Sequence, residues 1–138
     1  VRCTASTPLQ LVATRCEMST NGGTAGLCIF GSYNNTFNVC LKNCISHHNS
    51  NYGICVDSKG VVNVHGDATA IHSNGGFGIY ASNSAKVIIH LPSHHNTSYN
   101  NRGGFCFVGG ATISRAAKDS AGRTCATNRP QTENLWIL

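Results

Sequence analysis

The sequence has few charged residues, only 11% of 138, and just five of them are acidic: Glu17, Asp57, Asp67, Asp119 and Glu133. A close pair of carboxylates, which glycoside hydrolysis needs, is not visible, nor is an acid cluster that would hold calcium. Lys and Arg form no run, which argues against a nucleic-acid partner. No apolar stretch is long enough to cross a membrane. We therefore expect a non-enzymatic protein without a cofactor more than an enzyme.

What the chain does contain is a repeat. Tetrapeptides of one pattern recur 27, 25 and 26 residues apart: Gly26-Leu27-Cys28-Ile29, Gly53-Ile54-Cys55-Val56, Gly78-Ile79-Tyr80-Ala81 and Gly104-Phe105-Cys106-Phe107. An Asn precedes each glycine: Asn21, Asn49, Asn74 and Asn100. Apolar residues are spaced by two, which indicates strands, and Gly, Asn, Ser and Thr interrupt them at short intervals. Periods of this length are typical of repeat architectures.

Stacking these units in register predicts columns of side chains, because alternate residues of a strand face the same side. The first tetrapeptide strand predicts two apolar columns: Leu27, Ile54, Ile79, Phe105 and Ile29, Val56, Ala81, Phe107. A second wall is predicted from the apolar residues that follow: Phe37, Val62, Val87, Ile113 beside Val39, Val64, Ile89. No single unit buries its apolar face alone, but neighbours bury it jointly.

This unit resembles the right-handed parallel β-helix repeat of pectin-lyase-like proteins over roughly residues 9–114. The fold that we expect is all-β, a right-handed parallel β-helix of about four to five coils at residues 1–114. Residues 115–138 lack the alternation, and we expect them to form a non-repeat C-terminal tail that caps the last coil or adds a strand to a neighbour.

Eight cysteines without a CxxC pair or a zinc-finger spacing favour disulfides and an oxidising compartment. Residues stacked in adjacent coils lie within the Cα separation that a disulfide accepts. The pairs ranked first are Cys16–Cys44, Cys28–Cys55 and Cys106–Cys125. Cys3 and Cys40 are left over, and Cys3 is open to pairing with Cys28 or with a neighbouring molecule.

Two glycosylation sequons support an extracellular, secreted protein: they begin at Asn34 and Asn96, both at expected corners. The chain does not start with Met and has no signal peptide, so we expect a processed or excised piece of a longer protein.

Histidines recur at the repeat spacing and are the remaining candidates for chemistry. His65 and His90 are expected to stack in one column, with Cys40 before them, and His47 and His72 in another. Stacked imidazoles are candidates for a transition-metal site or a base near neutral pH. The interpretation that we favour is a polar ladder on a solenoid wall, with no metal.

The ends of the chain point to assembly. The N-terminus shows no polar cap, and the chain ends in an apolar segment: Leu135, Trp136, Ile137 and Leu138. Together with Cys3, these residues favour end-to-end self-association of a structural subunit in a secreted filament, surface coat or spike-like shaft. The alternative is a carbohydrate-binding or carbohydrate-modifying module cut from a larger protein. The net charge of +5 favours an anionic polysaccharide as its partner.

Overall fold

The computed structural model describes residues 2–4, 10–31, 36–66, 68–90, 98–118 and 124–126, and its secondary structure there is entirely β. Asn34, Asn96 and residues 135–138, which the sequence singled out, lie outside the described residues.

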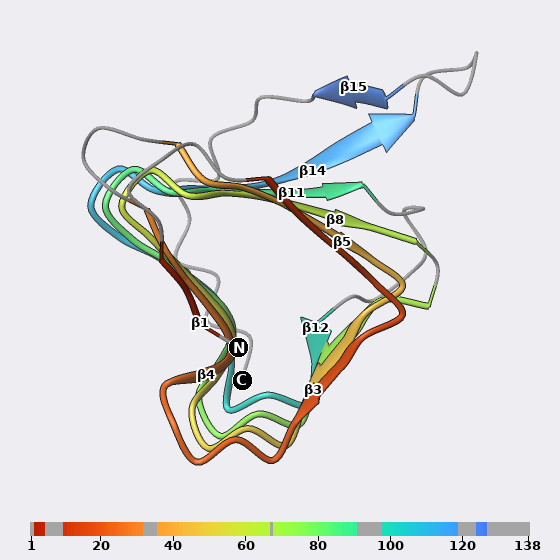
Figure 1. The fold of residues 1–138 in the computed structure, drawn as a ribbon, viewed down its shortest axis with the longest axis vertical. Coiled ribbons are helices and arrows are strands. Elements are labelled where there is room, and N and C mark those ends of the chain that lie inside the picture. Colours follow the sequence, from red (N-terminus) through yellow and green to blue (C-terminus); the bar gives the residue numbers. More distant parts are fainter. Residues whose placement is uncertain are drawn as a thin grey trace.

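The strands follow one another around three parallel sheets, so each strand pairs with the third one along the chain. Sheet A contains β1 (Arg2–Thr4), β4 (Ala25–Phe30), β7 (Tyr52–Asp57), β10 (Phe77–Ala81) and β13 (Gly103–Phe107). Sheet B contains β2 (Gln10–Thr14), β5 (Asn38–Lys42), β8 (Val61–His65), β11 (Lys86–His90), β14 (Thr112–Lys118) and the antiparallel β15 (Thr124–Ala126). Sheet C contains β3 (Glu17–Ser19), β6 (Ile45–His47), β9 (Ala70–His72) and β12 (Ser98–Tyr99). The result is the predicted parallel β-solenoid, of about four turns, with the sheets as its walls (Figure 1).

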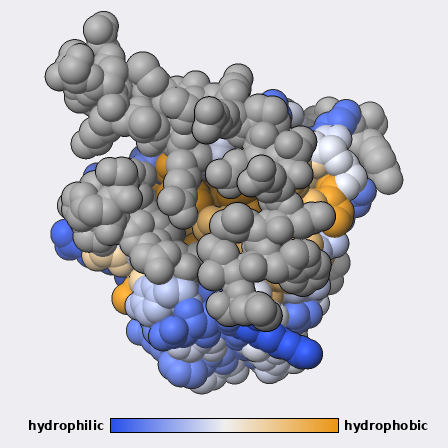
Figure 2. Space-filling model, turned by 180° about the vertical axis from the view of Figure 1, so that it is seen from behind, coloured by the Kyte–Doolittle hydropathy of each residue, from blue (hydrophilic) through white to orange (hydrophobic). Residues whose placement is uncertain are grey.

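The core fills the space between the sheets. The register confirms both columns predicted for sheet A, with Leu27, Ile54, Ile79 and Phe105 side by side in one of them. Residues inside the stack are almost fully buried, whereas Phe105, Phe107 and Ile113 of the last coil are only partly buried. Seen from behind, apolar residues lie toward the middle of the molecule and hydrophilic ones along its lower rim (Figure 2).

The predicted second wall is displaced by two residues in one coil. Val39 lies beside Val62, and Leu41 lies beside Val64. Phe37, which was predicted to lie beside Val62, therefore lies two residues before that column. The cause is the length of the connection between β4 and β5: seven residues separate Phe30 from Asn38, whereas three separate their register partners Asp57 and Val61. Phe37 is still fully buried, and the Val61 N–H donates to its carbonyl over 2.7 Å.

The corner between sheets A and B is a stack of tight turns with positive φ at both central residues. These pairs are Ser58-Lys59, Asn83-Ser84 and Gly109-Gly110. Main-chain hydrogen bonds join successive turns, as from the Lys59 N–H to the Asn83 carbonyl at 3.1 Å. Asp57 Oδ1 accepts from the Ser58 N–H at 2.8 Å, Ser82 Oγ at 2.8 Å and Asn83 Nδ2 at 2.7 Å, so one carboxylate holds two coils together. Gly and Asn at these corners follow from their tolerance of the left-handed region.

The C-terminal end of sheet B departs from the repeat. The boundary predicted at residue 114 falls inside β14, which runs to Lys118. Its first part, Thr112–Arg115, pairs with β11, and its last part, Ala116–Lys118, pairs with β15.

The inward columns can be tested with two neighbouring residues of β8. Val62→Asp places an unpaired carboxylate at a fully buried position and should cost several kcal/mol, enough to prevent cooperative folding. Asn63→Asp is the matched control: residue 63 faces outward, and its Oδ1 can still accept from His90 Nε2, 2.9 Å away. Thermal unfolding followed by circular dichroism checks both, and a cooperative Val62→Asp variant would contradict the assignment of faces.

Candidate functional site

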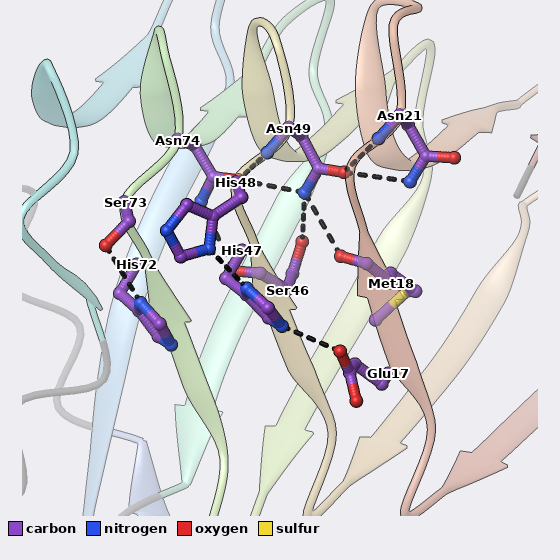
Figure 3. Close-up of polar contacts among 10 residues, drawn as sticks. All are labelled: Glu17, Met18, Asn21, Ser46, His47, His48, Asn49, His72, Ser73 and Asn74. Atoms are coloured by element: carbon purple, nitrogen blue, oxygen red, sulfur yellow. Dashed lines mark hydrogen bonds and ion pairs between the residues drawn. The ribbon is translucent and has the colours of Figure 1, made fainter.

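A ladder of asparagine amides runs along the corner between sheets C and A (Figure 3). The Nδ2 groups of Asn21, Asn49 and Asn74 each donate to the Oδ1 of the Asn in the next coil, at 2.8 Å in all three steps, and the ladder ends at Asn101. The backbone N–H groups of the same residues donate to the same oxygens at 3.0–3.3 Å. Asn49 and Asn74 are buried at 2% and 3% exposure with their amides bonded, as a buried polar group requires.

The asparagines that recur before the repeat glycines therefore form this ladder, except for the last of them. Asn101 continues the ladder, and Asn100 occupies the preceding position, which has positive φ in every coil. The residues at that position are Thr20, His48, Ser73 and Asn100, with φ of 53°, 52°, 54° and 52°. The left-handed conformation thus falls on the residue before each ladder Asn, and the ladder residues themselves serve as hydrogen-bonding groups.

Next to this ladder, sheet C carries a column of rings. His47 and His72 stack as predicted, with centroids 5.1 Å apart and planes 7° apart, and Tyr99 extends the column 4.9 Å from His72. Glu17 Oε1 lies 2.8 Å from His47 Nε2, and the other ring nitrogen of His47 lies 2.6 Å from His48 Nδ1. The hydrogen bond from His47 lowers the pKa of Glu17, with further contributions from Ser19 and from the His47 charge.

Sequence reasoning had found His47 and His72 but had given Glu17 and Tyr99 no part in the column. Tyr99 lies beside His72 in the register, so its place could have been read from the repeat. Glu17 could not, because it lies two residues before the position that aligns with His47 and reaches it diagonally.

A second histidine column lies on the outer face of sheet B. His65 and His90 stack at 4.2 Å, as predicted, but Lys42 precedes them in the register and Cys40 lies beside Asn63. The predicted place of Cys40 in this column was therefore wrong, because the β5–β8 register is shifted by two residues, as it is for Phe37. Burial lowers the pKa of both histidines, with the Lys42 charge also acting on His65 and the His65 charge on His90. His90 Nδ1 is buried and has no hydrogen-bond partner.

The cysteines of the described chain form no disulfide; those whose side chains are described are Cys16, Cys28, Cys40, Cys44, Cys55 and Cys106. Cys16 and Cys44 stack through the backbone, since the Ile45 N–H donates to the Cys16 carbonyl at 2.9 Å. Their side chains lie in different environments, however: Cys44 is buried and Cys16 is exposed. The side chain of Cys125, the predicted partner of Cys106, lies outside the described part of the structure.

Cys28 and Cys55 are register neighbours, yet they are held as thiols in a small apolar cluster outside sheet A. Burial raises the pKa of Cys55 to about 12, and the neighbouring Cys28 adds to the shift. Cys3 aligns with Ile29, and Arg2 aligns with Cys28, so the alternative pair Cys3–Cys28 is one residue out of register.

The same outer face carries stacked aromatic rings that the sequence analysis had not predicted. The ring centroid of Tyr52 lies 4.8 Å from that of Tyr80 and 6.2 Å from that of Phe77. A signal was present in the sequence, because Tyr52 and Phe77 each directly precede a repeat glycine.

Within the described residues, no group of three or more His, Cys, Asp and Glu is arranged to hold a metal ion. The same part of the chain contains no helix of the length and apolarity needed to span a membrane. A surface pocket of about 230 Å³ lies at the corner of sheets A and B, lined by Ser58, Lys59, Asn83 and Ser84, on a different corner from the asparagine ladder.

No protein-family model matches the chain, and searches of curated proteins and of solved structures found no similar protein.

The lowered pKa values of His65 and His90 predict a loss of stability in acid. Well above pH of about 6.5 both rings are neutral in the folded and unfolded chain. As the pH falls below that value, the unfolded chain binds protons that the folded chain does not, so the free energy of unfolding decreases until the lower folded pKa is passed. Urea unfolding between pH 7.5 and 5 should show this slope, and His90→Asn should reduce it. An unchanged slope in His90→Asn would show that these rings do not carry the effect.

Thiol reactivity provides a test of the cysteine environments. Brief treatment of native protein with N-ethylmaleimide at pH 7.5 should label exposed Cys16 first, and Cys44 and Cys55 only after unfolding, because burial excludes the reagent and the raised pKa removes the Cys55 thiolate. Peptide mass spectrometry measures the order. Linked Cys16–Cys44 or Cys106–Cys125 peptides in unreduced protein would instead support the disulfides expected from the sequence.

Proposed function

We propose that this protein is a structural β-solenoid, a subunit that docks end to end in a secreted extracellular assembly such as a filament, surface coat or spike-like shaft. The use of its polar side chains supports this role. Asp57 and the asparagine ladder hold one coil to the next, and Glu17 is engaged by His47. These acidic, amide and imidazole side chains are thus engaged in contacts that join one coil to the next.

The observation that carries the proposal is the incomplete burial of the core columns at both ends. Leu11 and Ala13 of β2 are only partly buried, whereas the next members of their columns, Val39 and Leu41, are 1% exposed. Phe105 and Phe107 are likewise only partly buried at the other end. A second copy stacked on either end would cover these columns as an internal coil does.

The strand edges favour the same contact. Among the described strands, β1, β2 and β3 each pair on one side only, as do β12 and β13 at the opposite end. Because β15 pairs only with Ala116–Lys118, the Thr112–Arg115 edge of β14 has no described partner either. Exposed edges of this kind are templates for pairing with another chain.

The strand counts indicate how two copies would fit. Sheets A and B each contribute five parallel strands and sheet C contributes four. Stacking β1 of one copy on β13 of another, and β2 on β14, therefore leaves one strand position in sheet C between β12 and β3. We propose that the apolar C-terminal residues 135–138 fill this position as an added strand.

A pair of substitutions on β2 tests the docking end. Leu11→Lys puts a charge into the column that a neighbour would cover and should abolish assembly, while Val12→Lys, on the outward face at 60% exposure, should not. Light scattering over a concentration series and negative-stain microscopy measure assembly, and thermal unfolding verifies that each variant folds. Deletion of residues 135–138 should also leave a folded domain that no longer assembles.

A wild-type chain that stays monomeric at high concentration would overturn the proposal. A monomer that binds an acidic polysaccharide would support the alternative, a carbohydrate-binding module.

A further inference from the structure

A group of titratable side chains lies together on the outer side of sheet C, next to the asparagine ladder. The rings of His47, His48 and His72 lie with centroids 4.9, 5.1 and 6.0 Å apart, and Glu17 contacts the first of them (Figure 3). His47 is half-buried, with 21% of its side chain exposed, and His48 is exposed.

The contacts determine where the protons lie. An ionised carboxylate only accepts hydrogen bonds, so His47 Nε2, 2.8 Å from Glu17 Oε1, is the donor. In the neutral ring, His47 Nδ1 then carries a lone pair, which points at His48 Nδ1 over 2.6 Å. With His47 neutral, the proton between the two Nδ1 atoms therefore belongs to His48.

We propose that His47 and His48 form a two-histidine site for a divalent transition metal, in which the ion replaces this proton between the two Nδ1 atoms. Imidazole nitrogens bind such ions at about 2.0–2.1 Å, which places two adjacent ligand nitrogens roughly 3 Å apart. The two Nδ1 atoms lie 2.6 Å apart, so they need to separate by less than about 1 Å to reach that value. Water would complete the coordination, because the described residues contain no arranged group of three ligands.

Glu17 supplies the independent observation in favour of a metal. A ligand histidine characteristically donates its second N–H to a carboxylate, which orients the ring and makes the ligating nitrogen more basic. Glu17 stands in that position toward His47 Nε2. By contrast, His72 Nδ1 contacts Ser73 Oγ at 3.0 Å, and His72 serves as the stacking neighbour of His47.

Protons and charge balance when the metal ion binds, and no redox step is needed. Each neutral imidazole keeps one N–H, so the His48 proton moves from Nδ1 to Nε2 through solvent as the ion enters, and no net proton is released at neutral pH. Two nitrogen ligands follow the usual order of divalent affinities, so Cu²⁺ should bind more tightly than Ni²⁺ or Zn²⁺.

The experiment is a Cu²⁺ titration of the full chain after its accessible thiols are blocked with N-ethylmaleimide. Calorimetry gives the affinity, and electron paramagnetic resonance reports the nitrogen ligands through their hyperfine splitting. We expect one site with two imidazole nitrogens. His48→Asn, which suits the left-handed backbone at this position, should remove it. Glu17→Gln should weaken it by about 10- to 100-fold.

Matched controls separate this pair from the other histidines. His65→Asn and His90→Asn in the sheet B column, and the double variant His94→Asn, His95→Asn, should leave the affinity unchanged. Cu²⁺ affinity and spectrum that are the same in His48→Asn as in wild type, or a site lost in the His94 and His95 variant, would overturn the proposal. The readout is independent of assembly, since it is measured equally on Leu11→Lys.

Discussion

Stacking of one coil on the next in register is the interaction on which the whole structure depends. A coil of three short strands encloses too little apolar surface to be stable by itself, so its inward residues are buried by the coils above and below. Ile79 is fully buried because Ile54 and Phe105 lie on either side of it in the column. The same arrangement explains why burial declines at both ends of the stack.

Register also dictates the polar chemistry of the surface. Parallel strands bring equivalent residues of successive coils side by side, so a residue type that recurs becomes a ladder. For asparagine this is favourable, because one amide both donates and accepts, and each step closes with bonds of 2.8 Å. For histidine the consequence is different: burial lowers the pKa of His90, and the charge of His65, whose ring stacks 4.2 Å away, lowers it further.

Pattern reasoning predicted the sheet A columns and both histidine pairs because period-two alternation and a period near 25 identify faces and neighbours. It failed for Phe37 because alternation is unchanged by a shift of two residues: Phe37 and Val39 are both apolar and both face inward. Two connections are longer than their counterparts in the neighbouring coil. The one at 31–37 shifts the β5–β8 register by two residues from the prediction, and the one at 66–69 brings the β6–β9 register back to the predicted one. The histidines of β6 and β9 therefore align as predicted, even though the prediction misaligned the strands that precede them, β5 and β8.

The cysteines show a similar limit. A spacing of one coil is necessary for a disulfide, but the side chains must also face each other in the same environment, and Cys16 and Cys44 do not.

The amino-acid sequence by itself determined the solenoid, since the repeat length, the alternation and the corner residues all require the same stacked strands. Only the tertiary structure decided which residues meet outside the repeat columns. Glu17 reaches His47 diagonally, and His48 is turned toward His47 at a corner with positive φ. These contacts depend on which side chain each coil carries and on the direction it takes, which vary from coil to coil and leave no period in the sequence.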